Sequence, residues 1–287
     1  MRVGAVFPQT EIGADRGGVR AYVEGVAELG FAHLLAYDHV LGAEPSGHPG
    51  FRGPYTHESM FHEIMVLFGF VAAVAPELEL VTGVVIAPQR QTVLLAKQAA
   101  ELDVLSGGRL RLGLGLGWNA VEYEGLGMRF TNRGRRFEEQ IDLLRRLWQE
   151  PVLTYEGRWE RVTSAGLNPL PIQRPIPIWI GANLEPALRR AARLGDGYIA
   201  LRPLEGGWDS TLERLRGWLE EAGRDPADFG LEARINVSRG SPDEWRAEAG
   251  EWRARGATHV SLLTMGGALT GPEAHVERLR VALEAVG

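Results

Sequence analysis

The chain has 287 residues, of which 45% are hydrophobic and 24% charged, and its formal net charge is −6. This length permits one large α/β barrel, and the acidic balance differs from the basic footprint of a nucleic-acid-binding protein. The absence of cysteine excludes disulfides, thiolate metal sites and cysteine nucleophiles.

The apolar segments of the sequence indicate neither secretion nor insertion into a membrane. The apolar run at residues 2–7 is too short for a signal peptide and ends at Pro8. The longest apolar stretch, residues 64–75, is shorter than a membrane span. We therefore expect a soluble, cytoplasmic protein that binds neither membrane nor nucleic acid.

Strand and helix signals alternate along the whole chain. Short apolar runs predict eight buried strands, at residues 2–7, 32–37, 78–86, 109–116, 176–181, 197–201, 231–237 and 259–264. Segments with helical period predict eight helices, at residues 18–30, 59–74, 92–108, 135–150, 185–195, 210–223, 242–256 and 272–286. Strands buried on both faces and alternating with helices indicate parallel βαβ units. Eight such units predict a closed (β/α)₈ TIM barrel, and without a composition shift we expect residues 1–287 to form one domain.

Two insertions interrupt this minimal barrel. The first, residues 41–59, follows the second strand and extends a loop at the C-terminal face, where barrel active sites lie. A loop of this length is either a lid or binding loop, or a surface excursion. The second insertion, residues 151–175, separates the fourth helix from the fifth strand and contains a predicted hairpin that turns at Glu156-Gly157.

The fourth strand reads "RLRLGLGLGW", with glycine at 113, 115 and 117 and then Trp118. All three glycines share the parity expected to face the barrel lumen, so they either open space for a flat ligand or absorb barrel curvature. The spacing does not match the G-x-G-x-x-G dinucleotide fingerprint, and the sequence has no P-loop.

Two further strand ends carry small residues. Gly83 interrupts a β-branched run at the end of the third strand, which suggests a bulge or a close approach to a ligand. Gly181, Ala182 and Asn183 precede the helix after the fifth strand. They either leave backbone amides free for an anion or reflect ordinary helix capping by Asn183.

Asp38 and His39 follow the second strand and therefore lie at the catalytic rim of a barrel. A histidine there can act as an acid or base near neutral pH, whereas Asp38 either tunes it or caps the following loop. Beyond the fourth strand, we expect Glu122 and Glu124 to face solvent.

Other charged residues allow structural interpretations. Asp103 is expected to be a helix-terminal carboxylate that pairs with Arg109, and the basic run 129–136 either meets an anionic ligand tail or is a solvated helix start. His48, His57 and His62 lack the spacing of a helical metal site, so we expect no metal.

These segments resemble the bacterial luciferase-like superfamily of flavin- and deazaflavin-dependent oxidoreductases. The resemblance rests on "LLAYDHVLG", on "TGVVIAPQRQTVLLAKQAAELDVLSGGRLRLGLGLGWNAVEYEGLG", on "RRFEEQIDLLRRLW" and on "PIPIWIGA…AARLGDGY". It covers most of residues 1–201, and "YDHV" with the short insertions is most similar to the branch that depends on coenzyme F420.

The resemblance implies a cofactor ring in the barrel mouth, with a non-prolyl cis peptide at Gly83–Val84 against its back face. It places the cofactor along Gly115, Leu116, Gly117 and Trp118 and its phosphate at Gly181, Ala182 and Asn183, with Arg202 as a further phosphate contact. It also places His39 beside the ring, where it transfers a proton, orients the substrate or hydrogen-bonds the cofactor.

The implied activity is hydride transfer between F420 and a small organic substrate; the alternative is an FMNH₂-dependent monooxygenase that uses O₂. Two departures from the family limit the inference. Leu116 stands where luciferase-like flavin enzymes have a phosphate-binding arginine, and Trp118 stands where deazaflavin sugar-phosphate dehydrogenases have an acidic glutamate. The resemblance therefore does not identify the substrate.

Two other classes of protein remain. One is a non-catalytic protein that retains the pocket, and the other is an unrelated barrel hydrolase, although the strand ends show no paired carboxylates for a hydrolase.

The second and third predicted helices are apolar around most of their circumference, in "MFHEIMVLFGFVAAV" and "VLLAKQAAELDVL". Because such a surface usually meets a partner, we expect a homodimer through these helices.

Overall fold

Residues 1–287 are all described in the computed structural model, in which eight parallel strands close into a barrel. The strands are β1 (Arg2–Val6), β2 (His33–Ala36), β3 (Glu79–Thr82) with its short continuation β4 (Val85–Ile86), β5 (Leu110–Gly115), β8 (Ile178–Ala182), β9 (Gly197–Ala200), β10 (Gly230–Asn236) and β11 (His259–Leu263). Each barrel strand pairs with its neighbours in parallel, and the pairing of β3 with β5 completes the ring. The predicted (β/α)₈ fold is therefore confirmed.

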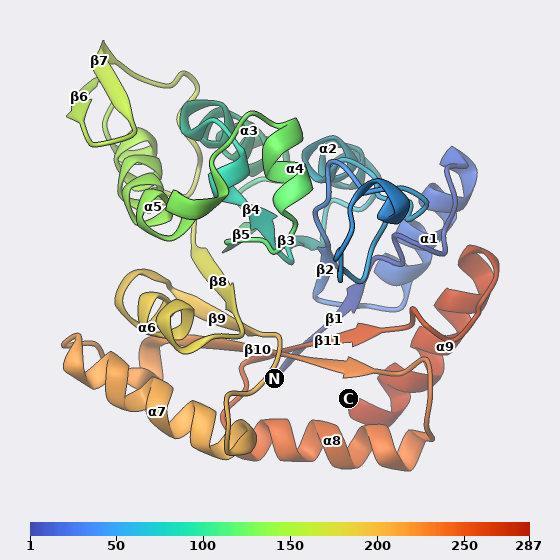
Figure 1. Ribbon diagram of the computed structural model, residues 1–287. Coiled ribbons are helices and arrows are strands. Elements are labelled where there is room, and N and C mark those ends of the chain that lie inside the picture. The colour runs from blue at the N-terminus through green and yellow to red at the C-terminus, as the bar shows by residue number, and fades with distance from the viewer.

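Eight helices surround the barrel (Figure 1). They are α1 (Arg16–Glu28), α2 (Ile64–Val74), α3 (Thr92–Leu105), α5 (Arg133–Gln149), α6 (Glu185–Leu194), α7 (Gly207–Glu221), α8 (Pro242–Ala254) and α9 (Gly271–Val286). The layer between helices and strands is one continuous hydrophobic core, in which Trp148, Tyr22 and Tyr198 are the largest fully buried side chains. None of the helices combines the length and the apolar character that a membrane crossing requires.

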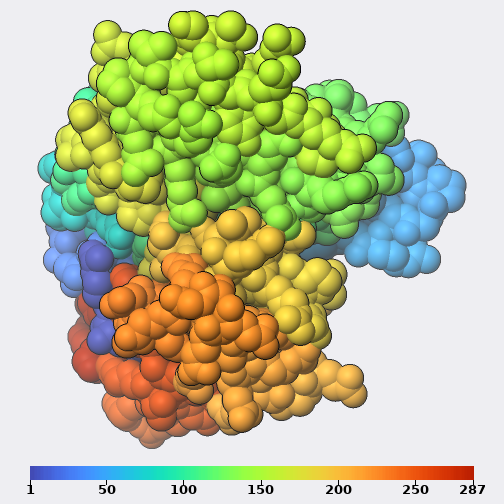
Figure 2. Space-filling view, turned by 90° about the vertical axis from the view of Figure 1, so that its left-hand side faces the viewer, coloured from blue at the N-terminus to red at the C-terminus, as the bar shows by residue number.

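Both insertions have the predicted positions. Antiparallel strands β6 (Leu153–Glu156) and β7 (Arg161–Ala165) form the expected hairpin, which projects beyond α5 in Figure 1. Apart from a 3₁₀ turn at Pro45–Gly47, residues 41–59 contain no helix or strand, and this segment protrudes in light blue at the right of Figure 2.

Local capping explains where the helices differ from the prediction. The carboxylate of Glu63 accepts a hydrogen bond from the amide of Val66, so α2 begins at Ile64 rather than at residue 59. A short helix that the prediction omitted, α4 (Ala120–Gly125), follows β5, and the side chain of Asn119 caps it.

The expected ion pair between Asp103 and Arg109 is wrong. Asp103 is a buried carboxylate near the end of α3, but it accepts hydrogen bonds from the amide and side chain of Gln173, at 2.8 and 2.7 Å. Arg109 instead directs Nε to the carbonyl of Leu78 at 3.3 Å. Asp103 thus ties α3 to the segment that leads into β8.

Candidate functional site

A cleft of about 290 Å³ lies at the C-terminal ends of the barrel strands. Six consecutive strand ends contribute to it, from β2 through β3–β4, β5, β8 and β9 to β10. The predicted residues that line it are Asp38, His39, Gly83, Val84, Gly115, Leu116, Gly117, Trp118, Gly181, Ala182 and Asn183. Arg202, the remaining predicted cofactor contact, is exposed and does not line this cleft.

Val84 occupies the space that two of the strand-end glycines leave. The Gly83–Val84 peptide is cis, as the family resemblance implied. A Cβ atom at Gly115 would lie 2.5 Å from Val84 Cγ2, and one at Gly181 would lie 2.7 Å from Val84 Cγ1. Glycine at these two positions is therefore needed for the Val84 side chain to enter the barrel mouth.

The other glycines of β5 have different neighbours. A Cβ atom at Gly113 would lie 1.9 Å from the carbonyl oxygen of Thr82, so this glycine serves the packing of β3 against β5. Gly117 has φ +65°, a left-handed conformation that glycine adopts without strain. Of the two interpretations of "GLGLG", close backbone packing thus explains Gly113, whereas Gly115 and Gly117 line the cleft.

His39 lies between a buried carboxylate and a group of aromatic rings. Its Nδ1 is 3.6 Å from Glu122 Oε2, and its ring packs edge-on against Tyr55, Phe61 and Trp118. No protein hydrogen bond involves Nε2, so this nitrogen is available to a ligand. Such a histidine can exchange a proton at Nε2 while Glu122 orients the ring.

Glu122 is buried, and the expectation that it faces solvent is wrong. Its carboxylate accepts hydrogen bonds from the amide of Val40 at 2.5 Å and from Gln89 Nε2 at 2.9 Å. Burial favours the neutral acid, but the bonds from His39, Val40 and Gln89 outweigh it and hold the pKa of Glu122 below its ordinary value. Glu124, two residues further along α4, is exposed as expected.

Asp38 points away from His39 towards Arg90. Its carboxylate contacts Arg90 Nη2 at 2.8 Å and accepts the amide of Ile86 at 3.2 Å. Burial raises the pKa of Asp38, and the charge of Arg90 partly offsets that effect. The residue therefore links the ends of β2 and β4 and does not cap the loop that follows it, whose first amides, those of Val40 and Leu41, donate to Glu122 instead.

Arg133 lines the cleft at the first residue of α5, within the basic run whose role the sequence left open. Its Nη1 donates to the carbonyl of Phe130 at 3.0 Å, whereas its buried Nε has no hydrogen-bond partner. Nearby along the cleft, α6 begins at Glu185 after Leu184, and no side chain caps it. Asn183 is thus not the cap. Pro186 has no amide hydrogen and Ala187 N donates to the carbonyl of Leu184 at 2.9 Å, so in this turn the amide of Glu185 is the one left to meet an anion.

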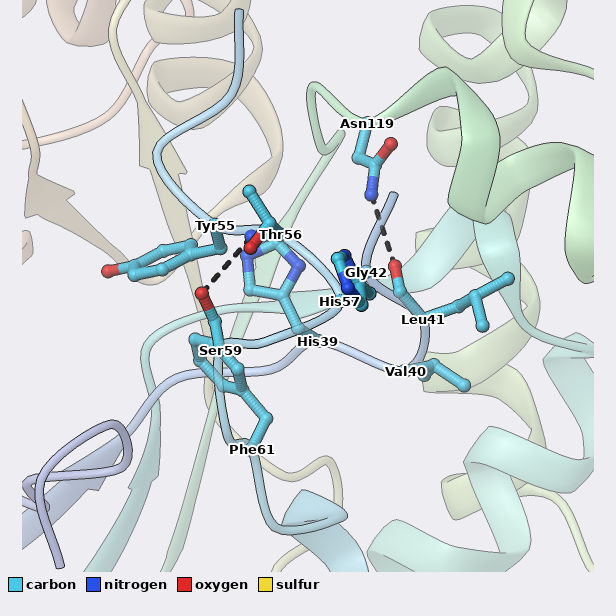
Figure 3. Close-up of a pocket in the computed structure, with 10 residues that line it drawn as sticks. All are labelled: His39, Val40, Leu41, Gly42, Tyr55, Thr56, His57, Ser59, Phe61 and Asn119. Carbon is cyan, nitrogen blue, oxygen red and sulfur yellow. Dashed lines mark hydrogen bonds between the residues drawn. The ribbon is translucent and has the colours of Figure 1, made fainter. Parts of the chain in front are cut away.

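A second cavity of about 250 Å³ adjoins the cleft inside the 41–61 loop (Figure 3). His39 and Tyr55 line both cavities. In Figure 3 the hydroxyl of Tyr55 points away from the other residues of this second pocket. The insertion therefore supplies one wall of the cleft, as a binding loop would.

Sequence reasoning missed three polar residues of the cleft, namely Tyr37, Tyr55 and Arg234. Tyr37 directly precedes the Asp38–His39 pair, and Arg234 lies near the C-terminal end of a predicted strand, so position at a strand end was the available signal. Tyr55 lies in an irregular loop, where no periodicity indicates side-chain direction.

Solved structures with the same fold include two oxidoreductases. The monooxygenase RslO1 from Streptomyces bottropensis superposes with a TM-score of 0.82 at 22% identity, covering 100% of this chain and 98% of that one. An F420-dependent secondary alcohol dehydrogenase superposes with a TM-score of 0.78 at 14% identity, covering 100% and 99%. At these identities the likeness concerns the fold.

Curated relatives match part of the chain. A protein of uncharacterised function from Mycobacterium bovis is 30% identical over 220 residues, which are 76% of this chain and 75% of that protein. An F420-dependent glucose-6-phosphate dehydrogenase from Kineococcus radiotolerans is 30% identical over 212 residues, or 72% of this chain and 57% of that enzyme. Other mycobacterial relatives are 35% identical over 164 residues, so the chain spans only 56% of their length.

The sequence profile of luciferase-like monooxygenases matches residues 1–283, which is nearly the whole chain. This match, together with the barrel and its cleft, shows that the chain is an enzyme of the luciferase-like monooxygenase family.

Proposed function

We propose that this enzyme is an F420-dependent oxidoreductase that transfers a hydride between the deazaflavin and a small organic substrate. The observation that carries the proposal is the convergence of the family's cofactor positions on one cleft, from Gly83–Val84 through Gly115–Trp118 to Gly181–Asn183. The F420-dependent relatives at 27% and 30% identity support the deazaflavin over FMN.

The residues of the cleft fit a planar ring with an anionic tail. Val84 gives the ring an apolar surface between Gly115 and Gly181. The unpartnered Nε of Arg133 and the free amide of Glu185 at the uncapped start of α6 offer hydrogen-bond donors to a phosphate. Arg133 would then take the role of the phosphate-binding arginine that this chain replaces with Leu116.

When bound, the deazaflavin supplies a carbon that accepts or donates a hydride, whereas the protein supplies position and electrostatics. His39 holds or accepts a proton at Nε2, because Glu122 engages its Nδ1 side. Trp118 lies 5.6 Å from His39, ring centre to ring centre, and helps to close the cleft.

The cleft does not favour a sugar phosphate as substrate. Trp118 occupies the position at which the family's sugar-phosphate dehydrogenases have an acidic glutamate, and its indole presents an apolar face. Glu122, the nearest buried carboxylate in this segment, is already engaged by Val40, Gln89 and His39. We therefore propose that the organic substrate is not glucose 6-phosphate, the substrate that the F420-dependent relatives are named for.

Paired titrations of the cofactor-free protein with F420 and with FMN, each oxidised and reduced, test the proposal. We expect F420 to bind at least tenfold more tightly than FMN. A preference for reduced FMN, followed by substrate-dependent oxygen uptake, would identify an FMNH₂-dependent monooxygenase instead. Failure of all four forms to bind would overturn the assignment of the cleft as a cofactor site.

We also propose that α2 and α3 form a homodimer interface. Val66 on α2 is 74% exposed, and Val93 and Leu94 on α3 are 43% and 53% exposed, so both helices direct apolar side chains to the surface. Light scattering at micromolar concentration should give a mass of about twice 31.5 kDa. A monomer under these conditions would contradict the proposal, and Val66→Glu should dissociate the dimer.

A further inference from the structure

The hydroxyl groups of Tyr37 and Tyr55 and the guanidinium of Arg234 lie in one corner of the cleft. Arg234 projects from β10, and its Nη1 donates to the Tyr37 hydroxyl oxygen at 2.9 Å. Because an arginine only donates, the Tyr37 oxygen is the acceptor and its own hydrogen remains to be donated. The Tyr55 hydroxyl has no protein partner, and it points away from the loop pocket in Figure 3.

This corner contains hydrogen-bond donors without a matching acceptor. The cleft holds two carboxylates, and both are engaged elsewhere: Asp38 by Arg90 and Glu122 by His39 and Val40. The next carboxylate down β10, Glu232, is bound to Arg111 and to His33. Arg234 therefore brings a positive charge to the cleft with no ion-pair partner.

The acidity of the two phenols is consistent with donor roles. Burial raises the pKa of Tyr55, although the charge of Arg234 lowers it in part. Burial also raises the pKa of Tyr37 despite its bond to Arg234. Both hydroxyls thus stay protonated at neutral pH and can donate.

We propose that Tyr37, Tyr55 and Arg234 form an anion-binding subsite that recognises a carboxylate of the organic substrate. A carboxylate has only acceptors, and it complements the planar fork of Arg234 and two phenolic donors. The inference rests on the proposed function, since it assigns the substrate to the same cleft as the cofactor. An anionic oxygen on the cofactor ring has the same chemistry and is the other source to be distinguished.

Calorimetric titration with benzoate, and with benzamide as a neutral analogue of similar shape, tests the subsite without requiring turnover. A 150 Å³ cavity accommodates benzene, so the cleft has room for either probe. We expect benzoate to bind the wild-type protein more tightly than benzamide. Arg234→Gln should weaken benzoate about ten- to a hundredfold, the range for charge-assisted hydrogen bonds, with little effect on benzamide.

Three variants separate recognition from folding and from overall charge. Arg234→Lys keeps the charge without the fork and should bind benzoate with intermediate affinity, and Tyr37→Phe should weaken it several-fold. Arg135→Gln makes the same charge change at an exposed arginine and should leave the affinity unchanged. Equal losses in the Arg135 and Arg234 variants, or wild-type binding of benzoate no tighter than that of benzamide, would refute the subsite.

A second arm repeats the benzoate titration with F420 bound. Retained benzoate affinity assigns the corner to the substrate, whereas mutually exclusive binding, with F420 affinity also lost in Arg234→Gln, assigns it to the cofactor and overturns the proposal. If F420 binds neither the wild type nor any of the variants, the proposed function fails. The comparison of benzoate with benzamide on the cofactor-free protein still decides whether the anion site exists.

Discussion

Glu232 and Arg234 stand two residues apart on β10 and both face the barrel lumen, yet they belong to opposite electrostatic environments. Glu232 is buried and fully engaged, bonded to Arg111, to His33 Nε2 at 2.9 Å and to the Ser261 hydroxyl. Arg234, one lumen layer nearer the mouth, has only the Tyr37 oxygen as partner. The comparison indicates that the charge of Glu232 in the closed half of the barrel serves the fold, whereas the charge of Arg234 at the mouth is available to a ligand.

The network around Glu232, which we call the lower network, explains how a barrel tolerates charge in its core. Arg111 also reaches Glu79 at 3.2 Å, and its guanidinium lies 4.3 Å from the ring centre of Trp179. A buried ion pair contributes little compared with apolar residues of the same size, but loss of one partner leaves an uncompensated charge. Substitutions in the two halves should therefore have different consequences.

The largest effect is expected for Arg111→Met. The variant leaves Glu232 buried without its cation, so unfolding in urea should show a loss of about 3–5 kcal/mol. Arg234→Met at the mouth should change the free energy of unfolding by less than about 1 kcal/mol, since it removes no ion pair. Equal losses of unfolding free energy in the two variants would contradict the distinction between structural charges in the closed half and ligand-accessible charge at the mouth.

Acid should weaken the lower network in two pH ranges. Burial disfavours the Glu232 carboxylate, but Arg111 and His33 outweigh this and hold its pKa well below the ordinary value. Its stabilising contribution is therefore present above the unfolded pKa of about 4.3 and is lost as the pH falls below it. His259, the first residue of β11, packs edge-on against Trp179 and His33 beside this network. Burial, together with the charge of Arg111, lowers the pKa of His259 to about 3, so the stabilising contribution of the neutral imidazole declines already below about pH 6.5.

Urea unfolding at several pH values separates these contributions. Glu232→Gln should be less stable than wild type at pH 7 and should show a flatter pH dependence below pH 4, whereas His259→Gln should be flatter between pH 6.5 and 4. Parallel curves for wild type and both variants would contradict the assignment.

Glu122 is an intermediate case, since it lies at the mouth but is fully engaged. In Glu122→Gln the new amide donors face the donors of Gln89 and His39, so we expect a loss of about 1–3 kcal/mol in the free energy of unfolding. Glu124→Gln, at an exposed position on the same helix, should change stability by less than about 0.5 kcal/mol. A similar effect in both variants would show that the buried contacts of Glu122 do not stabilise the mouth.

A small stability effect is also expected for Arg133→Gln, because Arg133 has no ion-pair partner and its one hydrogen bond is to the carbonyl of the nearby Phe130. The variant should instead weaken binding of F420 about tenfold, while the deazaflavin without its phosphate tail should bind equally well. Arg135→Gln provides the matched control at an exposed arginine. Equal weakening with and without the tail would place Arg133 at the ring rather than at the phosphate.

The strands and the strand ends were predictable from the sequence, whereas the directions of several side chains near them were not. Strand positions followed from apolar runs because strands buried on both faces require them, and each predicted strand overlaps an observed one. The cleft positions at 83–84, 115–118 and 181–183 followed from small residues at strand ends and from the family resemblance. The direction of a side chain in a loop or in a helix of six residues has no such signature, so the exposure of Arg202 and the burial of Glu122 on α4 were not predictable.

The sequence alone determined the barrel, its hairpin, and the strand ends that form the mouth, because periodicity and glycine placement act locally along the chain. Tertiary structure alone decided the partners of each charge. Asp38 binds Arg90 rather than His39, Glu122 is buried and accepts the amides of Val40 and Leu41, and Arg234 reaches Tyr37 across the lumen. These pairings join segments far apart in sequence, and only the folded barrel brings their side chains within hydrogen-bonding distance.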